Sequence, residues 1–159
     1  MKKRSFLKVS ATLMGTALVP SSSFALTNGN RRLRTAHIGV GGMGAADLDA
    51  ISSHPAVDVV ALCDVDQKNL KKAHAQFPNA KTFTDYRSLI SQMADEIDAV
   101  VVSTPDHTHA PASLMAMEYN KPVYCQKPLT HYVSEARAMR KMADEKNLVT
   151  QMGIQVHSF

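Results

Sequence analysis

A glycine-rich segment, GVGGMG, constrains the fold more than any other part of the chain. It contains the pattern G-x-G-x-x-G, whose glycines are Gly39, Gly41 and Gly44. The apolar run at 35–40 predicts a β-strand before the segment, and the residues from about 42 to 53 predict a helix after it. A strand, a glycine turn and a helix in this order are typical of a dinucleotide-binding unit.

Each residue of this loop has a predicted task. Gly39 permits a tight turn, Gly41 lets the backbone approach a pyrophosphate, and Gly44 allows close packing of helix on strand. Gly42 and Met43 lie where the helix begins, so their N–H groups are expected to face the phosphates. We therefore predict that all five residues bind the cofactor.

Asp64 lies twenty residues beyond Gly44, at the end of the β-branched run 57–65. That run predicts a second, buried parallel strand. An acid at its end is expected to hydrogen-bond the ribose hydroxyls of adenosine and to repel a 2′-phosphate. Taken alone, Asp64 suits a helix cap equally well. Together with the glycine loop, it predicts NAD as the cofactor in preference to NADP.

The rest of the chain alternates strand-like apolar runs with helical patterns. Further strands are predicted at 81–83, 98–104, 122–125 and 148–153. Six strands alternating with five helices indicate an α/β fold with a parallel doubly wound sheet, the Rossmann arrangement. The length suits one domain, which we place at 35–159.

The first 25 residues have the composition of an export signal, with a basic start, an apolar core at 9–19 and a small-x-small site ending at Ala25. The segment KRSFLK is similar to the twin-arginine (Tat) motif with lysine in place of the first arginine, and an ordinary Sec signal is the alternative. The core is too short to span a bilayer, so no stable membrane anchor is expected after cleavage. We predict a periplasmic or secreted protein with a linker at 26–34.

The formal charge of +4 does not predict a nucleic-acid partner. Lys2, Lys3, Arg4 and Lys8 all lie in the leader, which has no acidic residue. Removing these four from the 18 basic residues leaves 14, which equals the 14 acidic residues. The remainder of the chain is therefore formally neutral, and we expect no nucleic acid to bind.

The segment STPDHTHAP ends the fourth predicted strand. The carboxyl ends of parallel strands form the ligand crevice where the strand order reverses. We therefore predict that the cofactor contacts four residues of this turn: Ser103, Thr104, Pro105 and His109. The alternative is a capped helix start with solvent-facing histidines. His107 and His109 alone do not make a metal site, since no further ligand cluster accompanies them, and no metal is predicted.

The segment VYCQKPLTH ends the fifth predicted strand at the same edge. Pro128 prevents the strand from continuing, so Lys127 lies at its carboxyl end. A lysine there is able to donate to a substrate oxygen or to lie beside the nicotinamide. We predict that Lys127 is catalytic and that Gln126 and Lys127 contact the cofactor. The alternative is a surface lysine in a proline turn.

These three motifs, in this order, resemble the Gfo/Idh/MocA family, named after glucose–fructose oxidoreductase and inositol dehydrogenase. The resemblance covers about 35–159, and the segment at 150–158 is similar to a secreted bacterial branch that often carries Gln-Lys-Pro. It implies NAD(P)-dependent hydride transfer on sugars, cyclitols or related polyols. Lys127 would match the motif lysine that contacts substrate and nicotinamide, and His109 the histidine of the strand-four turn.

Two departures from the family pattern matter. Gln126 replaces the usual glutamate, so a carboxylate that would pair with Lys127 is missing. Family members continue into a second α/β domain that binds substrate, supplies a catalytic histidine and builds oligomers, whereas this chain stops at Phe159. We expect it to be the nucleotide-binding part, truncated before the substrate domain, with a homo-oligomer expected of the full-length form. An NAD-assisted glycosidase and a non-catalytic dinucleotide-binding module are the competing interpretations.

Overall fold

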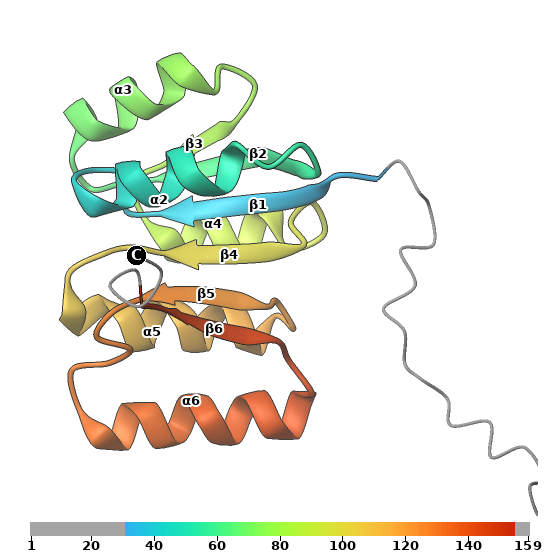
Figure 1. The fold of residues 1–159 in the computed structure, drawn as a ribbon, viewed down its shortest axis with the longest axis vertical. Helices are drawn as coiled ribbons and strands as arrows, with labels where there is room; N and C mark the ends of the chain where they lie inside the picture. Colours follow the sequence, from blue (N-terminus) through green and yellow to red (C-terminus); the bar gives the residue numbers. More distant parts are fainter. Residues whose placement is uncertain (1–30, 155–159) are drawn as a thin grey trace, which may run out of the picture. The chain divides into compact units, whose positions relative to one another are not determined.

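The computed structural model describes residues 31–154, which fold into one parallel sheet with helices on both faces (Figure 1). The elements follow in the order β1 (Leu33–Ile38), α2 (Met43–Ser52), β2 (Val57–Cys63), α3 (Gln67–Gln76), β3 (Lys81–Phe83), α4 (Tyr86–Met93), β4 (Ala99–Val102), α5 (Asp106–Glu118), β5 (Val123–Gln126), α6 (Val133–Lys146) and β6 (Thr150–Gly153). This alternation confirms the predicted doubly wound α/β fold. The predicted leader and the segment after 154 lie outside the described residues.

The strand order is β3-β2-β1-β4-β5-β6, with every neighbouring pair parallel. The order reverses between β1 and β4, where Ile38 pairs with Val102. The arrows of β1, β4 and β5 all point the same way in Figure 1, so their carboxyl ends share one edge. A ligand crevice is expected at this edge, beside the reversal.

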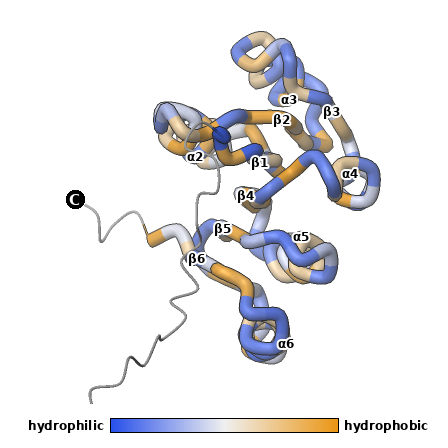
Figure 2. Tube along the Cα trace, turned by 90° about the vertical axis from the view of Figure 1, so that its right-hand side faces the viewer, coloured by the Kyte–Doolittle hydropathy of each residue, from blue (hydrophilic) through white to orange (hydrophobic). Residues whose placement is uncertain are grey.

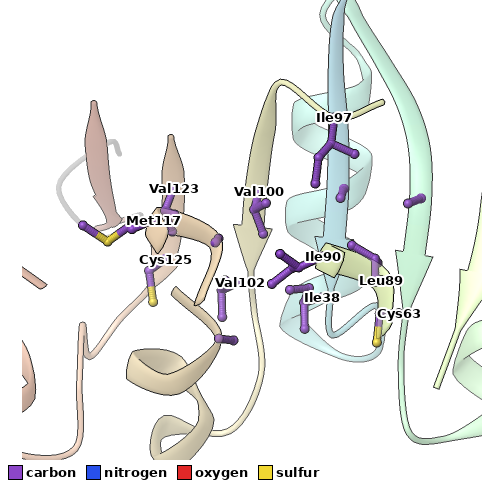
Figure 3. Close-up of a cluster of buried hydrophobic side chains, with 14 of the residues drawn as sticks. Ile38, Cys63, Leu89, Ile90, Ile97, Val100, Val102, Met117, Val123 and Cys125 are labelled. Carbon is purple, nitrogen blue, oxygen red and sulfur yellow. The ribbon is translucent and has the colours of Figure 1, made fainter. Parts of the chain in front are cut away.

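Two clusters of buried apolar side chains cover the two faces of the sheet. The larger packs the central strands against α4, α5 and α6, with Ile90, Met117 and Val102 among its members (Figure 3). The smaller packs the opposite face against α2 and α3, and Figure 2 shows α2 across the sheet from α4 and α5. Each large side chain buried in this way stabilises the fold by about 1.5–3 kcal/mol. The two clusters fix the strand ends that carry the candidate site.

The first strand begins earlier than the sequence predicts. β1 starts at Leu33, inside the predicted linker 26–34, and ends at Ile38. Leu33 and Arg34 pair with the start of β2, and the Arg34 guanidinium lies 2.9 Å from Asp98 Oδ1. The Arg34 backbone N–H also donates to Asp98 Oδ2 at 2.9 Å. The predicted linker extends too far, because partners distant in the sequence hold Leu33 and Arg34 in the sheet.

Within residues 31–154, no helix combines the length and apolar character that a bilayer crossing requires. The two cysteines, Cys63 and Cys125, are both buried free thiols. They lie at the ends of β2 and β5, which are separated in the sheet by β1 and β4.

Candidate functional site

A cavity of about 690 Å³ opens at the carboxyl edge of the sheet. Its volume lies within the range of roughly 300–1,000 Å³ typical of small-molecule sites. The walls come from the ends of β1, β2, β3 and β4. The predicted site residues among them are Gly39, Gly41, Asp64, Ser103, Thr104 and Pro105. Residues from separate motifs of the sequence therefore meet in one place.

The glycine loop lies directly against the turn after β4. Gly39 has a φ of 83°, and a Cβ added there would lie 2.5 Å from the Ser103 carbonyl oxygen. A Cβ on Gly44 would collide with the Gly39 carbonyl. Only glycine permits both the turn and the close approach of the helix to the strand. The backbone of Gly39 and Gly41 thus forms part of the cavity wall.

The helix that follows the loop has no side-chain cap. Gly42 occupies the N-cap position of α2, and Met43, which is 48% exposed, is its first residue. The first backbone hydrogen bond at this end of the helix joins two residues of the glycine loop: Gly44 N–H donates to the Gly41 carbonyl at 2.9 Å. The opening N–H groups of a helix are natural donors to phosphate oxygens. This end of α2 therefore suits a pyrophosphate.

Asp64 is half-buried on the cavity wall, and backbone donors fix its carboxylate. Oδ2 accepts from Val40 N–H at 2.9 Å, and Oδ1 accepts from Asp66 N–H at 2.8 Å. Each carboxylate oxygen has two lone pairs, so both remain able to accept a ribose hydroxyl. The cap of α3 is Asp66, which accepts from Lys68 N–H at 2.7 Å. Asp64 is therefore not a helix cap.

The turn after β4 contributes a hydroxyl without a partner. Thr104 Oγ1 is buried and has no hydrogen-bond partner among the described residues, although Thr104 lines the cavity. A buried polar atom of this kind destabilises the fold by about 1–3 kcal/mol unless something bonds to it. Together with the glycine backbone and the Asp64 carboxylate, it gives the cavity the mixed donors and acceptors that a dinucleotide requires.

His109 lies behind the cavity wall and is only 1% exposed. Its Nδ1 is 2.6 Å from the Pro128 carbonyl oxygen and its Nε2 is 2.7 Å from that of Thr104. The ring donates to both carbonyls only when it carries two N–H groups. His109 thus connects the strand-four turn to the Lys-Pro turn, while the exposed histidine on the cavity wall is His107. The predicted direct contact between His109 and the cofactor stays a prediction, and the geometry favours an indirect role.

Gln126 and Lys127 lie at the end of β5, next to the strand-four turn. Cys125 pairs with Val102 of β4, so Gln126 occupies the same level of the edge as Ser103. Gln126 is buried, Lys127 is exposed, and the peptide bond between Lys127 and Pro128 is cis. Neither residue lines the cavity. The predicted contacts of Gln126 and Lys127 with the cofactor therefore stay predictions.

Several wall residues are absent from the sequence prediction. The Asn69 side chain lies so close to Gly41 that any Cβ there would meet it. Tyr86 and Arg87 begin α4, with the guanidinium carbon 4.7 Å from the centre of the Tyr86 ring. The rule that strand ends meet at one edge would have indicated the residues after β3. Asn69 carried no such signal, because it lies inside a helix.

Cys63 also lies on the cavity wall but is a poor nucleophile. Burial, followed by the charges of Asp64 and Asp85, raises its pKa to about 12. The thiol therefore stays protonated at neutral pH. Among residues 31–154, no group of three or more metal-ligating side chains is close enough to hold an ion.

Known proteins with similar sequences and folds include dehydrogenases. An inositol 2-dehydrogenase of Rubrobacter xylanophilus is 34% identical over 109 residues, which cover 68% of this chain and 30% of that protein. A glycosyl hydrolase family 109 protein of Stenotrophomonas maltophilia is 33% identical over 137 residues, covering 79% and 29%. The structure of myo-inositol 2-dehydrogenase from Lactobacillus plantarum superposes with a TM-score of 0.75 at 27% identity, covering 81% and 38%. The chain thus spans about a third of the length of these relatives.

The family comparison covers most of the chain. Residues 33–154 match the Gfo/Idh/MocA model, which is described as an oxidoreductase family with an NAD-binding Rossmann fold. The match includes the glycine loop, Asp64, the strand-four turn and the Lys-Pro turn. The observed sheet order and the cavity at its reversal agree with that description. The chain therefore belongs to the Gfo/Idh/MocA oxidoreductase family, of which it carries the NAD-binding Rossmann domain with NAD as its cofactor.

Proposed function

We propose that the protein is an NAD-dependent oxidoreductase that transfers a hydride between the cofactor and a hydroxyl-bearing carbon of a sugar, cyclitol or related polyol. One observation carries this proposal. The glycine loop, Asp64 and Thr104 surround one cavity, and Lys127 follows the next strand at the same edge. Similarity to an inositol 2-dehydrogenase supports a polyhydroxylated substrate.

Different residues of the cavity bind different parts of the cofactor. The loop backbone and the N-terminus of α2 hold the pyrophosphate. The Asp64 carboxylate accepts from the adenosine ribose and disfavours a 2′-phosphate by charge repulsion. The Thr104 hydroxyl bonds to the ligand where the wall approaches the Lys-Pro turn. Bound NAD supplies a hydride acceptor at its nicotinamide ring.

Lys127 is the proposed catalytic residue of this chain. Its ammonium group orients a substrate hydroxyl and stabilises the negative charge that develops as that hydroxyl loses its proton. The proton acceptor comes from outside the described residues. Gln126, lacking a charge, forms no ion pair with the ammonium and leaves it available for the substrate.

A lysine substitution tests this role in the native full-length protein. Lys127→Ala is expected to lower kcat/KM for a cyclitol or sugar roughly 100-fold, as removal of one stabilising donor does in other enzymes. NADH affinity should change little. Lys72→Ala removes an exposed lysine on α3 and serves as the matched control. Turnover within about twofold of the parent, less than roughly 0.5 kcal/mol of barrier, would exclude Lys127 from the mechanism.

A second candidate is an NAD-assisted glycosidase that cleaves through transient oxidation. The similarity to a glycosyl hydrolase family 109 protein favours this candidate. Release of sugar from a glycoside without accumulation of NADH would identify this activity. Steady NADH production from a free polyol would identify the dehydrogenase. NADH binding without turnover across both substrate panels would leave a non-catalytic dinucleotide-binding module.

We also propose that the protein is exported and belongs to a secreted branch that carries Gln-Lys-Pro. The support is the sequence of residues 1–25, which suits a Tat-like leader, and the presence of Gln126 in the motif. Residues 35–159 then act as the nucleotide-binding domain of a longer protein that forms a homo-oligomer. N-terminal sequencing of the periplasmic protein should find a start at Leu26. An intact Met1 in that fraction would contradict cleavage.

A further inference from the structure

Asp47 is a buried acidic residue that the proposed mechanism does not use. It lies on α2, three residues after Gly44, and is 9% exposed. Its Oδ2 accepts from the Ser103 hydroxyl at 2.6 Å. Gln126 Nε2 donates to Oδ1 at 3.0 Å and to Oδ2 at 3.1 Å. The carboxylate is thus held by neutral donors from the ends of β4 and β5, which offset the penalty of burying it.

Gln126 completes a chain of bonds from this carboxylate to the Lys-Pro turn. The residue is 4% exposed, and its Oε1 accepts from the backbone N–H of Lys127 at 2.7 Å. Its amide nitrogen faces an acceptor and its amide oxygen faces a donor, so only one orientation of the amide satisfies both. Glutamate lacks the donor that Asp47 requires. It would instead place a second carboxylate about 3 Å from the first.

We propose that Asp47 and Gln126 are a matched pair of positioning residues that hold the backbone of Lys127 against the helix of the glycine loop. The acid at position 47 favours an amide over a second acid at position 126, because the amide supplies the N–H donor that the carboxylate accepts. Asp47 also bonds Ser103, the neighbour of Thr104. The inference rests on the proposed role of Lys127 and adds the residues that fix its position.

The electrostatic surroundings of the pair are compatible with a single charge. Tyr124, on β5, is a titratable group that responds to Asp47: burial first, and the Asp47 charge second, raise its pKa. The hydroxyls of Ser103 and Tyr124 are neutral at pH 7. A second carboxylate at position 126 would therefore meet no compensating cation among these groups, and one of the two acids would retain a proton.

Exchanging the two functional groups tests the pair directly. In the double variant Asp47→Asn/Gln126→Glu, the amide introduced on α2 donates to the carboxylate introduced on β5 and accepts from Ser103. That carboxylate still accepts from Lys127 N–H. Gln126→Glu alone places two acids together, and Asp47→Asn alone loses one bond. Asp49→Asn makes the same chemical change on the exposed face of α2 and is the matched control.

The first readout is the melting temperature at pH 7 and pH 5, which does not depend on activity. The carboxyl of Gln126→Glu is expected to have a folded-state pKa above its unfolded value of about 4.3, so its protonated form favours folding. The variant should melt at a lower temperature than the parent at pH 7, and this difference in melting temperature should become smaller at pH 5. The exchanged variant should regain most of the lost stability at pH 7. If Gln126→Glu melts at the temperature of the parent at both pH values, the two residues are not a pair. The same conclusion follows if the double variant is no more stable at pH 7 than Gln126→Glu alone.

The second readout is turnover in the native full-length protein. Gln126→Glu should lower kcat at pH 7 about tenfold, which corresponds to roughly 1.4 kcal/mol, with NADH affinity nearly unchanged. The exchanged variant should restore at least half of the parent kcat. Equal losses in kcat and NADH affinity would overturn the positioning role. If the unmodified protein shows no turnover, the proposed function fails, while the melting experiment still decides whether the residues are a pair.

Discussion

Two stretches of the same sheet edge differ in how their polar groups are used. The cavity side, formed by the glycine loop, Asp64 and Thr104, lines a space of about 690 Å³ and includes a buried hydroxyl that has no hydrogen-bond partner among residues 31–154. The lysine side, formed by Gln126, Lys127 and Pro128, bonds its inner groups to the protein itself. Gln126 is tied to Asp47, and the Pro128 carbonyl is tied to a buried histidine. One side is organised to receive a ligand, and the other to present a single ammonium group.

Under the proposed function, this difference separates the residues that bind the cofactor from the residue that acts on the substrate. The cavity side contains the groups that a dinucleotide needs within one domain. The lysine side offers one exposed cation, and under the proposed function the substrate is held by residues outside 31–154. We therefore expect NADH binding to depend on the cavity side, and turnover to depend additionally on the lysine side.

The largest expected effect is on the cavity side, from Gly44→Ala. The new methyl group would collide with the Gly39 carbonyl and force the loop away from β4. We expect a loss of roughly 2–4 kcal/mol in the free energy of unfolding. NADH binding should fall at least about 100-fold, equivalent to roughly 2.7 kcal/mol.

Denaturant unfolding and NADH fluorescence measure the two effects of this substitution. Ala50→Ser adds one heavy atom on the exposed face of the same helix and should change neither. If Gly44→Ala binds NADH as tightly as the parent, then NADH binding does not require the close approach of loop and strand. That result would contradict the role given to the cavity side.

A second prediction concerns β1, the strand that leads into the glycine loop. His37, the last residue but one of β1, is 1% exposed, and burial lowers its pKa to about 4. Because the unfolded chain takes up the proton near pH 6.5, stability is complete above that pH and falls as the pH drops toward 4. The expected loss between pH 7 and pH 5 is about 2 kcal/mol.

Thermal melts across this pH range test the role of His37. His37→Leu should flatten the dependence, whereas His131→Leu, which removes an exposed histidine, should preserve it. A parent that is equally stable at pH 7 and pH 5 would contradict the assignment to His37.

The smallest expected effect is the change in NADH affinity caused by substitution of Asp64. Asp64→Ala removes the ribose acceptor together with the bond to Val40 N–H, so NADH should bind about tenfold more weakly, equivalent to roughly 1.4 kcal/mol. Discrimination against NADPH should narrow because the repelling charge is gone. Titrations with both nucleotides measure the ratio, with Asp58→Ala on the exposed part of β2 as the control. Equal affinities of the unmodified protein for NADH and NADPH would refute the role of Asp64.

The sequence was sufficient for the fold and for most of the cavity side. Parallel strands place their carboxyl ends at one edge, so residues that directly follow strand-like runs can be brought together without coordinates. Thr104 was predicted in this way, whereas Gly39 was predicted from the glycine motif and Asp64 from its place at a strand end twenty residues beyond that motif. The same rule applied to β3 would have added Tyr86 and Arg87.

The remaining features depend on contacts that no local pattern reveals. Asp47 is one acidic residue in a helix, and such residues usually face solvent. Its burial follows from the packing of α2 over the ends of β4 and β5. His109 was assigned to the ligand because of its strand-end position, but its direction is set by two backbone carbonyls. Arg34 was assigned to a linker because its partner, Asp98, is 64 residues away.

The central pairing of β1 with β4 also has a consequence for the order of folding. The unit from β1 to β2 joins neighbours in the sequence and needs only a short loop closure, whereas β4 must return to β1 across more than 60 residues. Such distant pairings form slowly because the entropy of closing the loop is lost before the contacts are gained. We therefore expect the glycine loop to form before its facing wall, Ser103 and Thr104, which is added only when the central strands join. A nucleotide that requires both walls is expected to bind only after β1 and β4 have paired.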